Sequence, residues 1–273
     1  MLAERETKST SSKSNTGSRA VLAVSEIFSS LQGEGPYSGT PAAFLRLAFC
    51  NLHCWFCDTK YSWLFHQKLL NTVKGDLERL GVKASPADLI VHERSKEATE
   101  MAVEEVKTEL LKTGKDHLVI TGGEPMLQQS ALFPLIQDLK SNRDFFIEVE
   151  TSGTLAPNFG MREAVDAWNV SPKLESSGNP SSLREKPRVL TLFSELANAT
   201  FKFVVQTPED LREVEGLVER YSIPRNRVML MPEGTDAGTL QERSAWLLKA
   251  CSDSGFRFSS RLHILLWGNK RGV

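Results

Sequence analysis

The sequence predicts an α/β fold with a largely parallel sheet. After residue 20, short apolar stretches that are typical of strands alternate with helix-like stretches along the chain. Strands that alternate with helices of this length usually pair in parallel, because each helix returns the chain to the same end of the sheet. The chain has 273 residues, of which 40% are hydrophobic, so it is long enough to bury a full core.

The first 20 residues differ from the rest of the chain. They are rich in Ser, Thr, Lys and Arg and contain almost nothing apolar, so we expect a disordered leader before a single folded domain at residues 21–273. A transit peptide is the alternative for this segment, but such peptides avoid acidic residues, and Glu4 and Glu6 lie within it.

The folded region begins with two predicted strands, at residues 24–28 and 43–49. Both contain the β-branched or aromatic residues that favour strands, and the second ends at Cys50. Residues 60–84 show no clean hydrophobic period, so we interpret them as an insertion.

A long helix is expected next, over residues 86–113, with at most one break. Ser85 can cap its start, Pro86 is tolerated in the first turn, and Gly114 is a suitable stop. Residues 117–121 then form a buried strand that leads into a pair of glycines.

The C-terminal half continues the alternation. Residues 175–187 are rich in Ser, Pro and Gly and are expected to form a loop, whereas Thr207 begins one helix and Thr239 with Glu242 has the capping-box spacing that begins another. The expected helices are 131–140, 207–221 and 239–252, and the expected strands are 145–149, 168–170, 201–205, 227–231 and 262–267.

Polar side chains lie at or just after the ends of several predicted strands. They are Cys50, Thr121, Glu150, Ser171 and Gln206. Because ligands of parallel α/β sheets collect at the carboxyl ends of the strands, we expect these residues to converge on one site.

The charge of the chain gives no reason to expect a nucleic acid or an anionic membrane as a partner. There are 33 basic and 34 acidic side chains, for a net charge of −1. No apolar run approaches the roughly 18 residues of a membrane span, and the start lacks a signal-peptide core. We therefore expect a cytoplasmic protein.

The cysteines are the strongest chemical signal. Only four are present, which excludes a disulfide scaffold, and three of them (Cys50, Cys54 and Cys57) fall within eight residues. Thiolates select iron–sulfur clusters, zinc or copper(I). Three ligands without a fourth suit a four-iron cluster with one open iron; zinc, with His53 as fourth ligand, and redox thiols are the alternatives. Cys251 lies in a predicted helix and is expected to be a buried apolar residue.

The spacing of these cysteines, with Phe56 before the last, resembles the signature of the radical S-adenosylmethionine superfamily, and residues 121–125 (TGGEP) resemble its GGE motif. Further stretches resemble the 7-carboxy-7-deazaguanine synthase family: LQGEG at 31–35, FLRL at 44–47, CDT at 57–59, ETSG at 150–153, SPK at 171–173 and WGNKRGV at 267–273. The resemblance runs in order from about residue 24 to the end, and it implies a radical catalytic domain built as an incomplete (βα) barrel.

For the cofactors, the resemblance implies a [4Fe-4S] cluster on the three clustered cysteines, with S-adenosylmethionine on its open iron. The residues implied on the cofactor side are Phe56, Cys57, Asp58, Gly122, Gly123, Glu150, Ser171, Lys173 and Gln206. From the sequence alone, Phe56 is equally consistent with a core aromatic, the two glycines with a tight turn, and Glu150 with a solvated loop carboxylate.

For the substrate, the resemblance implies 6-carboxy-5,6,7,8-tetrahydropterin. The residues implied are Leu31, Gln32, Gly33, Arg46, Thr121 and His263. Arg46 suits a carboxylate, because a guanidinium can pair with it in two-pronged fashion; a buried salt bridge is the alternative. A core histidine is the alternative for His263. Thr59 is implied to hold Mg²⁺, which prefers oxygen ligands.

The implied reaction begins with hydrogen abstraction from C6, followed by ring contraction and loss of ammonia to give 7-carboxy-7-deazaguanine, on the way to the queuosine base of tRNA. An electron donor such as flavodoxin or ferredoxin and a homodimer are implied by analogy. The rival functions are a glycyl-radical-enzyme activase, which shares the cysteine spacing, and a non-catalytic zinc-binding module.

Overall fold

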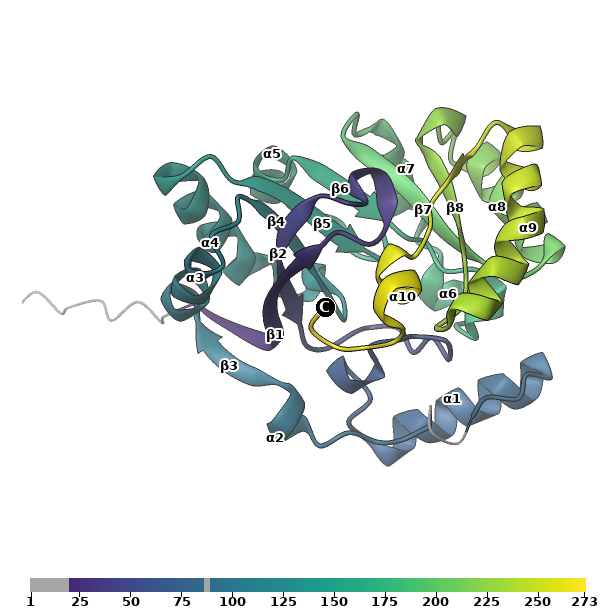
Figure 1. Cartoon of the computed structure of the whole chain (residues 1–273), viewed down its shortest axis with the longest axis horizontal. Helices are drawn as coiled ribbons and strands as arrows, with labels where there is room; N and C mark the ends of the chain where they lie inside the picture. Colours follow the sequence, from purple (N-terminus) through teal and green to yellow (C-terminus); the bar gives the residue numbers. More distant parts are fainter. Residues whose placement is uncertain (1–19, 86–88) are drawn as a thin grey trace, which may run out of the picture.

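The computed structural model describes residues 20–85 and 89–273, and this part of the chain forms one nine-stranded sheet (Figure 1). The strands follow the order β3-β1-β2-β4-β5-β6-β7-β8-β9. From β2 to β9 all neighbours are parallel, whereas β1 runs antiparallel to both β2 and β3. The predicted α/β fold with a largely parallel sheet is therefore confirmed.

The described strands are β1 (Val21–Leu31), β2 (Pro41–Leu47), β3 (Thr99–Ala102), β4 (His117–Gly122), β5 (Phe146–Thr151), β6 (Ala167–Val170), β7 (Ala199–Val205), β8 (Val228–Pro232) and β9 (Arg257–Phe258). The described helices are α1 (Gln67–Leu80), α2 (Arg94–Glu97), α3 (Val103–Lys112), α4 (Gln129–Asn142), α5 (Phe159–Ala164), α6 (Ser181–Arg184), α7 (Pro187–Glu195), α8 (Pro208–Arg220), α9 (Ala237–Ser254) and α10 (Leu262–Trp267). None of these helices is long and apolar enough to cross a membrane.

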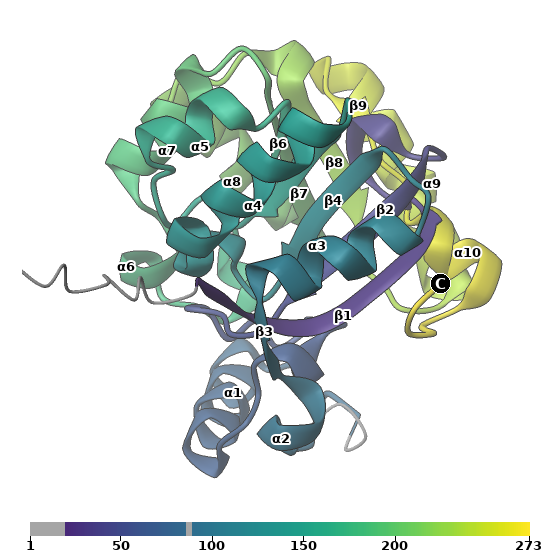
Figure 2. The same ribbon diagram turned by 90° about the vertical axis from the view of Figure 1, so that its left-hand side faces the viewer.

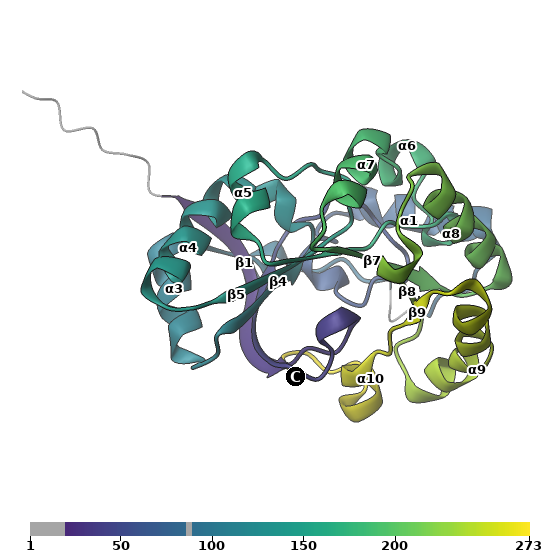
Figure 3. The same ribbon diagram turned by 90° about the horizontal axis from the view of Figure 1, so that it is seen from above.

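The sheet is curved and open rather than closed into a barrel. Figure 3 shows helices such as α4, α5, α7 and α8 along its outer side, and α10 with the C-terminus on its inner side. The largest core lies between the outer helices and the sheet and includes Trp168, Phe201 and Phe203, which are almost completely buried. Burying large apolar side chains on this face leaves the inner side of the sheet available for a site.

The predicted helix over residues 86–113 is confirmed only in part, at α2 and α3. Residues 86–88, where it would begin, lie outside the described residues. Farther on, the chain forms the short helix α2, then β3, and only then α3. The strand β3 pairs antiparallel with β1, from Val24↔Thr99 to Val21↔Ala102. The free edge of β1 offers backbone hydrogen bonds to this segment, and this tertiary pairing overrides local helix propensity.

The segment at residues 60–84 contains a regular helix that the sequence interpretation missed. Helix α1 buries Leu70, Val73 and Leu77, which have the spacing of one helical face, and ends at Gly81 in the left-handed conformation. With Trp63 and Leu64 these residues form a second, smaller core. Figure 2 shows α1 and α2 projecting from the body of the domain.

The predicted strand at residues 262–267 is also wrong, because these residues form helix α10. Only Ile264 is buried there, whereas Leu265, Leu266 and Trp267 are exposed. A short apolar run can be a strand or a helix, and periodicity alone does not separate the two. The last strand is β9, two residues long and paired with β8.

Two smaller expectations also need correction. The predicted loop at 175–187 contains α6 and the first residue of α7. Helix α9 begins earlier than expected, because the side chain of Asp236 accepts a hydrogen bond from the Thr239 backbone N–H and caps the helix. By contrast, Thr207 caps α8 through the backbone N–H of Asp210, as its position predicted.

Candidate active site

A cavity of about 240 Å³ lies on the inner side of the sheet, at the carboxyl ends of the parallel strands. All of the site residues predicted from the sequence line it except Gln206. The lining residues among them are Leu31, Gln32, Gly33, Arg46, Cys50, Cys54, Phe56, Cys57, Asp58, Thr59, Thr121, Gly122, Gly123, Glu150, Ser171, Lys173 and His263. The topology thus brings together residues from six regions of the sequence.

Gln206 is not part of this cavity. Its backbone N–H donates to the Asp210 carboxylate at the start of α8, 2.7 Å away. Its Nε2 is buried and has no hydrogen-bond partner among the described residues. The residue that follows the end of β7 therefore belongs to the cap of α8 rather than to the cavity wall.

The cysteine loop follows β2 and brings Cys50, Cys54 and Cys57 to the cavity wall as free thiols. Burial raises the pKa of the Cys54 thiol to about 11 and that of Cys50 still further. Such buried thiols need a strong positive charge beside them to become thiolates, and a bound metal supplies that charge. The donor set therefore fits an iron–sulfur cluster with three protein ligands.

His53 does not complete a zinc site. Its Nε2 lies 3.1 Å from the Asp76 carboxylate on α1, and His53 is not part of the cavity wall. Cys251 is buried in α9, away from the other three cysteines in the sequence and outside the cavity lining. Within the described ranges, no three His, Cys, Asp or Glu side chains surround a point where a single metal ion could bind.

The two glycines at the end of β4 pack against the backbone where β2 ends and the cysteine loop begins. A Cβ on Gly122 would stand 2.2 Å from the Leu47 carbonyl oxygen, and a Cβ on Gly123 would stand 1.8 Å from that of Phe49. Gly122 also has a φ of +125°, a conformation that L side chains rarely adopt. Glycine is therefore required here for close backbone packing, and both glycines remain exposed to the cavity.

Glu124, the acidic residue of the same motif, stabilises the fold and does not line the cavity. Glu124 is completely buried and is not part of the cavity wall. Its carboxylate accepts hydrogen bonds from Thr151 and Ser152 at the end of β5 and from the Met126 backbone N–H. Glu124 thus ties the end of β4 to the end of β5, beneath the glycines.

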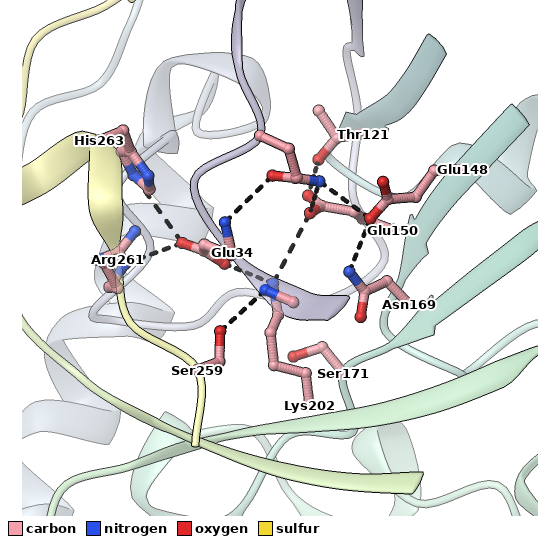
Figure 4. A network of polar contacts seen from close by, with 12 residues as sticks. Glu34, Thr121, Glu148, Glu150, Asn169, Ser171, Lys202, Ser259, Arg261 and His263 are labelled. Carbon is pink, nitrogen blue, oxygen red and sulfur yellow. Dashed lines mark hydrogen bonds and ion pairs between the residues drawn. The ribbon is translucent and has the colours of Figure 1, made fainter. Parts of the chain in front are cut away.

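A buried charge network closes one side of the cavity (Figure 4). Glu34 lies 2.5 Å from Lys202 Nζ and 2.9 Å from Arg261 Nε, and Arg261 also pairs with Asp58. Burial opposes ionisation of Glu34, but Lys202 and Arg261 hold the pKa of that carboxyl well below its usual range. His263, on α10, lies 3.9 Å from Glu34.

A second set of polar side chains lies beside this network, and its members are joined by hydrogen bonds (Figure 4). Gln32 Nε2 donates to Glu148 and, at 3.3 Å, to Glu150, which also accepts from Thr121 Oγ1 at 2.7 Å. Asn169 Nδ2 donates to Glu148, whereas its Oδ1 is buried and has no partner among the described residues. Burial raises the pKa of Glu148.

Arg46 satisfies both interpretations of its sequence position. Its Nε pairs with the Glu26 carboxylate at 2.8 Å, so the salt bridge exists, and Arg46 also lines the cavity. Glu26 is held by further hydrogen bonds from Tyr61 and from Arg271 in the C-terminal segment. Arg46 is therefore fixed in orientation by one edge of its guanidinium.

Sequence reasoning missed several polar residues of this site: Glu34, Glu148, Asn169, Lys202 and Arg261. Lys202 and Glu148 lie inside otherwise apolar strands, β7 and β5, in the same way that Arg46 lies inside β2. That signal singled out Arg46 and would have found both. Arg261 could not be found in this way, because it does not lie within a predicted strand: it lies just before residues 262–267, which form α10.

Comparison with known proteins agrees with this geometry. Residues 45–172, which contain the cysteine loop and the glycine pair, match the family model "Radical SAM superfamily". The chain is 38% identical to a 7-carboxy-7-deazaguanine synthase of Pyrobaculum aerophilum, over 91% of this chain and 96% of that protein. It is 32% identical to one of Rhodopirellula baltica, over 94% and 90%.

Among solved structures, the crystal structure of QueE from Escherichia coli is similar, with a TM-score of 0.61 and 25% identity over 89% of this chain and 95% of that one. The similarity to these proteins extends over 90% or more of their length. The chain therefore belongs to the 7-carboxy-7-deazaguanine synthase family of the radical S-adenosylmethionine superfamily.

Proposed function

We propose that this chain converts 6-carboxy-5,6,7,8-tetrahydropterin to 7-carboxy-7-deazaguanine with loss of ammonia, a step toward the queuosine base of tRNA. The observation that carries the proposal is that the three-cysteine loop and the buried polar groups of the sheet line one cavity. A cluster-bound radical source and a hydrogen-bonding heterocycle can therefore occupy adjacent parts of the same space. Both of the relatives compared above bear the name of this activity.

Proteins of this superfamily carry a [4Fe-4S] cluster and S-adenosylmethionine, and Cys50, Cys54 and Cys57 are the residues that would hold the cluster here. The bound pair supplies a 5′-deoxyadenosyl radical that abstracts a hydrogen from the substrate. The rest of the wall then has three tasks, which are to orient the two ligands, to exclude water and to hold the charges of both.

The cofactor side of the cavity would be formed by the glycine pair together with Phe56, Ser171 and Lys173. Gly122 and Gly123 present backbone without side chains, so a ligand can approach closely. Lys173 Nζ bonds the carbonyl and hydroxyl oxygens of Ser171, both at 2.8 Å, which fixes its ammonium beside the cavity. Asp58 and Glu150 complete this group, whereas Gln206 has no place in it.

The substrate side would be formed by the polar groups around Gln32. A pterin presents ring N–H groups and carbonyl or imine acceptors, which need acceptors and donors in fixed positions. The carboxylate oxygens of Glu150 and the hydroxyl oxygen of Thr121 would supply acceptors for the ring N–H groups. Leu31, Gly33 and His263 close this end, and Arg46 would pair with the substrate carboxylate.

Thr59 is the proposed protein ligand of Mg²⁺. It lines the cavity at the end of the cysteine loop, where its hydroxyl lies 3.4 Å from the Cys57 sulfur. Mg²⁺ prefers oxygen ligands and keeps several waters, so one hydroxyl from the protein together with substrate oxygens is a chemically reasonable set.

The proposed partners are a flavodoxin or ferredoxin as electron donor and a second copy of the chain in a homodimer. Four free cysteines, three of them intended for an oxygen-sensitive cluster, require a reducing compartment, so we place the reaction in the cytoplasm. Product leaves as a small molecule, and the protein itself contacts no nucleic acid.

Anaerobic reconstitution followed by turnover tests the proposal. We expect iron and sulfide near four per chain, and formation of a deazapurine chromophore when the carboxy-tetrahydropterin, S-adenosylmethionine and a reductant are added. Cleavage of S-adenosylmethionine without a deazapurine product would refute the substrate assignment. One tightly held zinc and no sulfide would refute the radical chemistry altogether.

A further inference from the structure

Each of the three clustered cysteine sulfurs accepts one N–H hydrogen bond. The Leu52 backbone N–H donates to Cys50 Sγ at 3.4 Å, which is a contact within the loop itself. The other two donors are side chains from outside the loop, with Trp63 Nε1 3.3 Å from Cys57 Sγ and Asn179 Nδ2 3.2 Å from Cys54 Sγ.

Trp63 is held in place by the small core around helix α1. The side chain is 5% exposed and packs with Leu64 and with the apolar face of α1, and the partly buried Cys57 packs against the same core. The indole has a single donor, its Nε1–H, and that donor points at the sulfur. The segment at 60–84, which looked like an insertion, thus delivers a directed N–H group to the cysteine loop.

Asn179 lies in the segment just before α6 and is fixed by further hydrogen bonds. Its Oδ1 accepts from the His53 backbone N–H at 2.9 Å, and its carbonyl oxygen accepts from Arg184 Nε. With one end anchored on the cysteine loop, the Nδ2 can reach both Cys54 Sγ and Ser177 Oγ at 3.2 Å. At 2% exposure, Asn179 is shielded from water.

We propose that Trp63 and Asn179 are positioning residues that raise the reduction potential of the cluster held by this loop. The reduced cluster carries one more negative charge than the oxidised cluster, and part of that charge lies on the cysteine sulfurs. An N–H donor therefore stabilises the reduced form more than the oxidised form, and such hydrogen bonds are an established control of cluster potential. The inference rests on the cluster of the proposed function, but not on its substrate.

The first test measures the potential of the reconstituted cluster by EPR at a series of solution potentials, without substrate. Trp63→Phe removes the indole N–H and keeps an aromatic ring, and Asn179→Leu removes the amide and keeps its approximate shape. At the midpoint potential of the parent, we expect the ratio of reduced to oxidised cluster to fall about fivefold in each variant, tenfold being about 59 mV for one electron.

Trp55→Phe is the matched control. Trp55 lies in the same loop, but its Nε1 donates to the Ser176 carbonyl oxygen at 2.7 Å and not to a sulfur. We expect its cluster potential to equal that of the parent. An unchanged potential in Trp63→Phe, or an equal shift in Trp55→Phe, would overturn the proposal.

A second measurement uses the unsubstituted protein and so does not depend on how well a variant folds. Indole-¹⁵N tryptophan is incorporated, and the reduced cluster is examined by electron spin-echo envelope modulation. We expect a ¹⁵N coupling that is absent from unlabelled protein and survives in Trp55→Phe; its absence from labelled parent protein would refute the role of Trp63. Potential shifts in a protein that forms no deazaguanine would refute the proposed function while this inference stands.

Discussion

Substitution of Glu124, whose carboxylate is buried, tests whether this residue holds the end of β4 to the end of β5. Its Oε1 accepts from Thr151 Oγ1 at 2.7 Å and from the Met126 N–H at 3.1 Å. Its Oε2 accepts from the Ser152 N–H at 2.8 Å and from the Ser152 hydroxyl at 2.5 Å. Glu124→Gln keeps the shape but replaces one oxygen with an amide group that donates, so one backbone N–H must lose its acceptor whichever way the amide turns.

The expected cost follows from these four bonds. A buried N–H left without an acceptor costs about 1–3 kcal/mol, and the remaining bonds lose the extra strength of bonds to a charged group. We therefore expect Glu124→Gln to lower the free energy of unfolding by about 2–4 kcal/mol. For a chain of this size that loss corresponds to a fall in Tm of roughly 5–15 °C, measured by anaerobic thermal unfolding of protein with equal iron content.

Glu195→Gln provides the control, because Glu195 is an exposed residue at the end of α7. A substitution of this kind away from buried features changes stability by no more than about 0.5 kcal/mol. If Glu124→Gln unfolds within about 2 °C of the parent, as Glu195→Gln should, then the carboxylate does not tie β4 to β5 and the reasoning is wrong.

Four further predictions concern the site directly. Cys251→Ala should leave the iron content per chain unchanged in a metal assay, because that buried thiol lies outside the cavity lining. Gly123→Ala should lower both Tm and retained iron, since its Cβ would stand 1.8 Å from a backbone carbonyl oxygen, whereas Gly75→Ala, in open space on α1, should lower neither. Burial holds the pKa of His263 below 6.5, so on acidification its imidazole is protonated in the unfolded chain before it is protonated in the folded chain. The contribution of neutral His263 to the free energy of unfolding is therefore complete above pH 6.5 and is lost as the pH falls below that value. Between pH 7 and pH 5.5, the Tm of His263→Asn should fall by less than the Tm of the unsubstituted protein. Arg46→Lys should raise the KM for the pterin at least several-fold and leave S-adenosylmethionine cleavage in its absence unchanged; an equal loss of both would contradict its assignment to the carboxylate.

The parallel part of the sheet could be predicted from sequence because its strands are fully buried. The burial of β4, for example, is continuous from Leu118 to Thr121, and such a run leaves little alternative to a central strand. The predicted strands at 117–121, 145–149 and 201–205 accordingly match β4, β5 and β7 to within two residues at each end.

The elements that sequence reasoning missed depend on contacts rather than on local pattern. Residues Thr99–Ala102 become a strand because β1 pairs with β2 along one edge and offers its other edge to this segment. Residues Leu262–Trp267 become a helix because only Ile264 packs inward, a fact that the apolar run itself conceals. The partner of Thr99–Ala102 is far away in the sequence, and a short apolar run does not by itself separate a strand from a helix, so no local period could reveal either element.

The site residues divide in a similar way, into those that a local motif reveals and those that meet only in the folded chain. Its cysteines and glycines were visible as motifs, since chemistry and close packing require those residue types at that spacing. The charge network was not, because Glu34 and Arg261 meet across a separation of 227 residues. A further general sign was available, namely a charged side chain within an apolar strand, which marks Lys202 as it marks Arg46.

The partners of the cavity's cations indicate which of them is free to receive a substrate carboxylate. Lys202 pairs with Glu34 and also lies 3.7 Å from the Glu150 carboxylate. Lys173 donates two hydrogen bonds to oxygens of Ser171. Arg261 uses Nε, Nη1 and Nη2 on three different acceptors. Arg46 bonds only through Nε, and in the described part of the chain its two terminal nitrogens have no hydrogen-bond partner. Lys202 and Arg261 already face carboxylates, which would repel a further anion, whereas both terminal nitrogens of Arg46 can bond a carboxylate side by side, because the parallel N–H groups of a guanidinium match its two oxygens. The salt bridge that seemed to compete with a substrate role for Arg46 therefore supports it, since it fixes the orientation of the guanidinium and leaves the terminal nitrogens available.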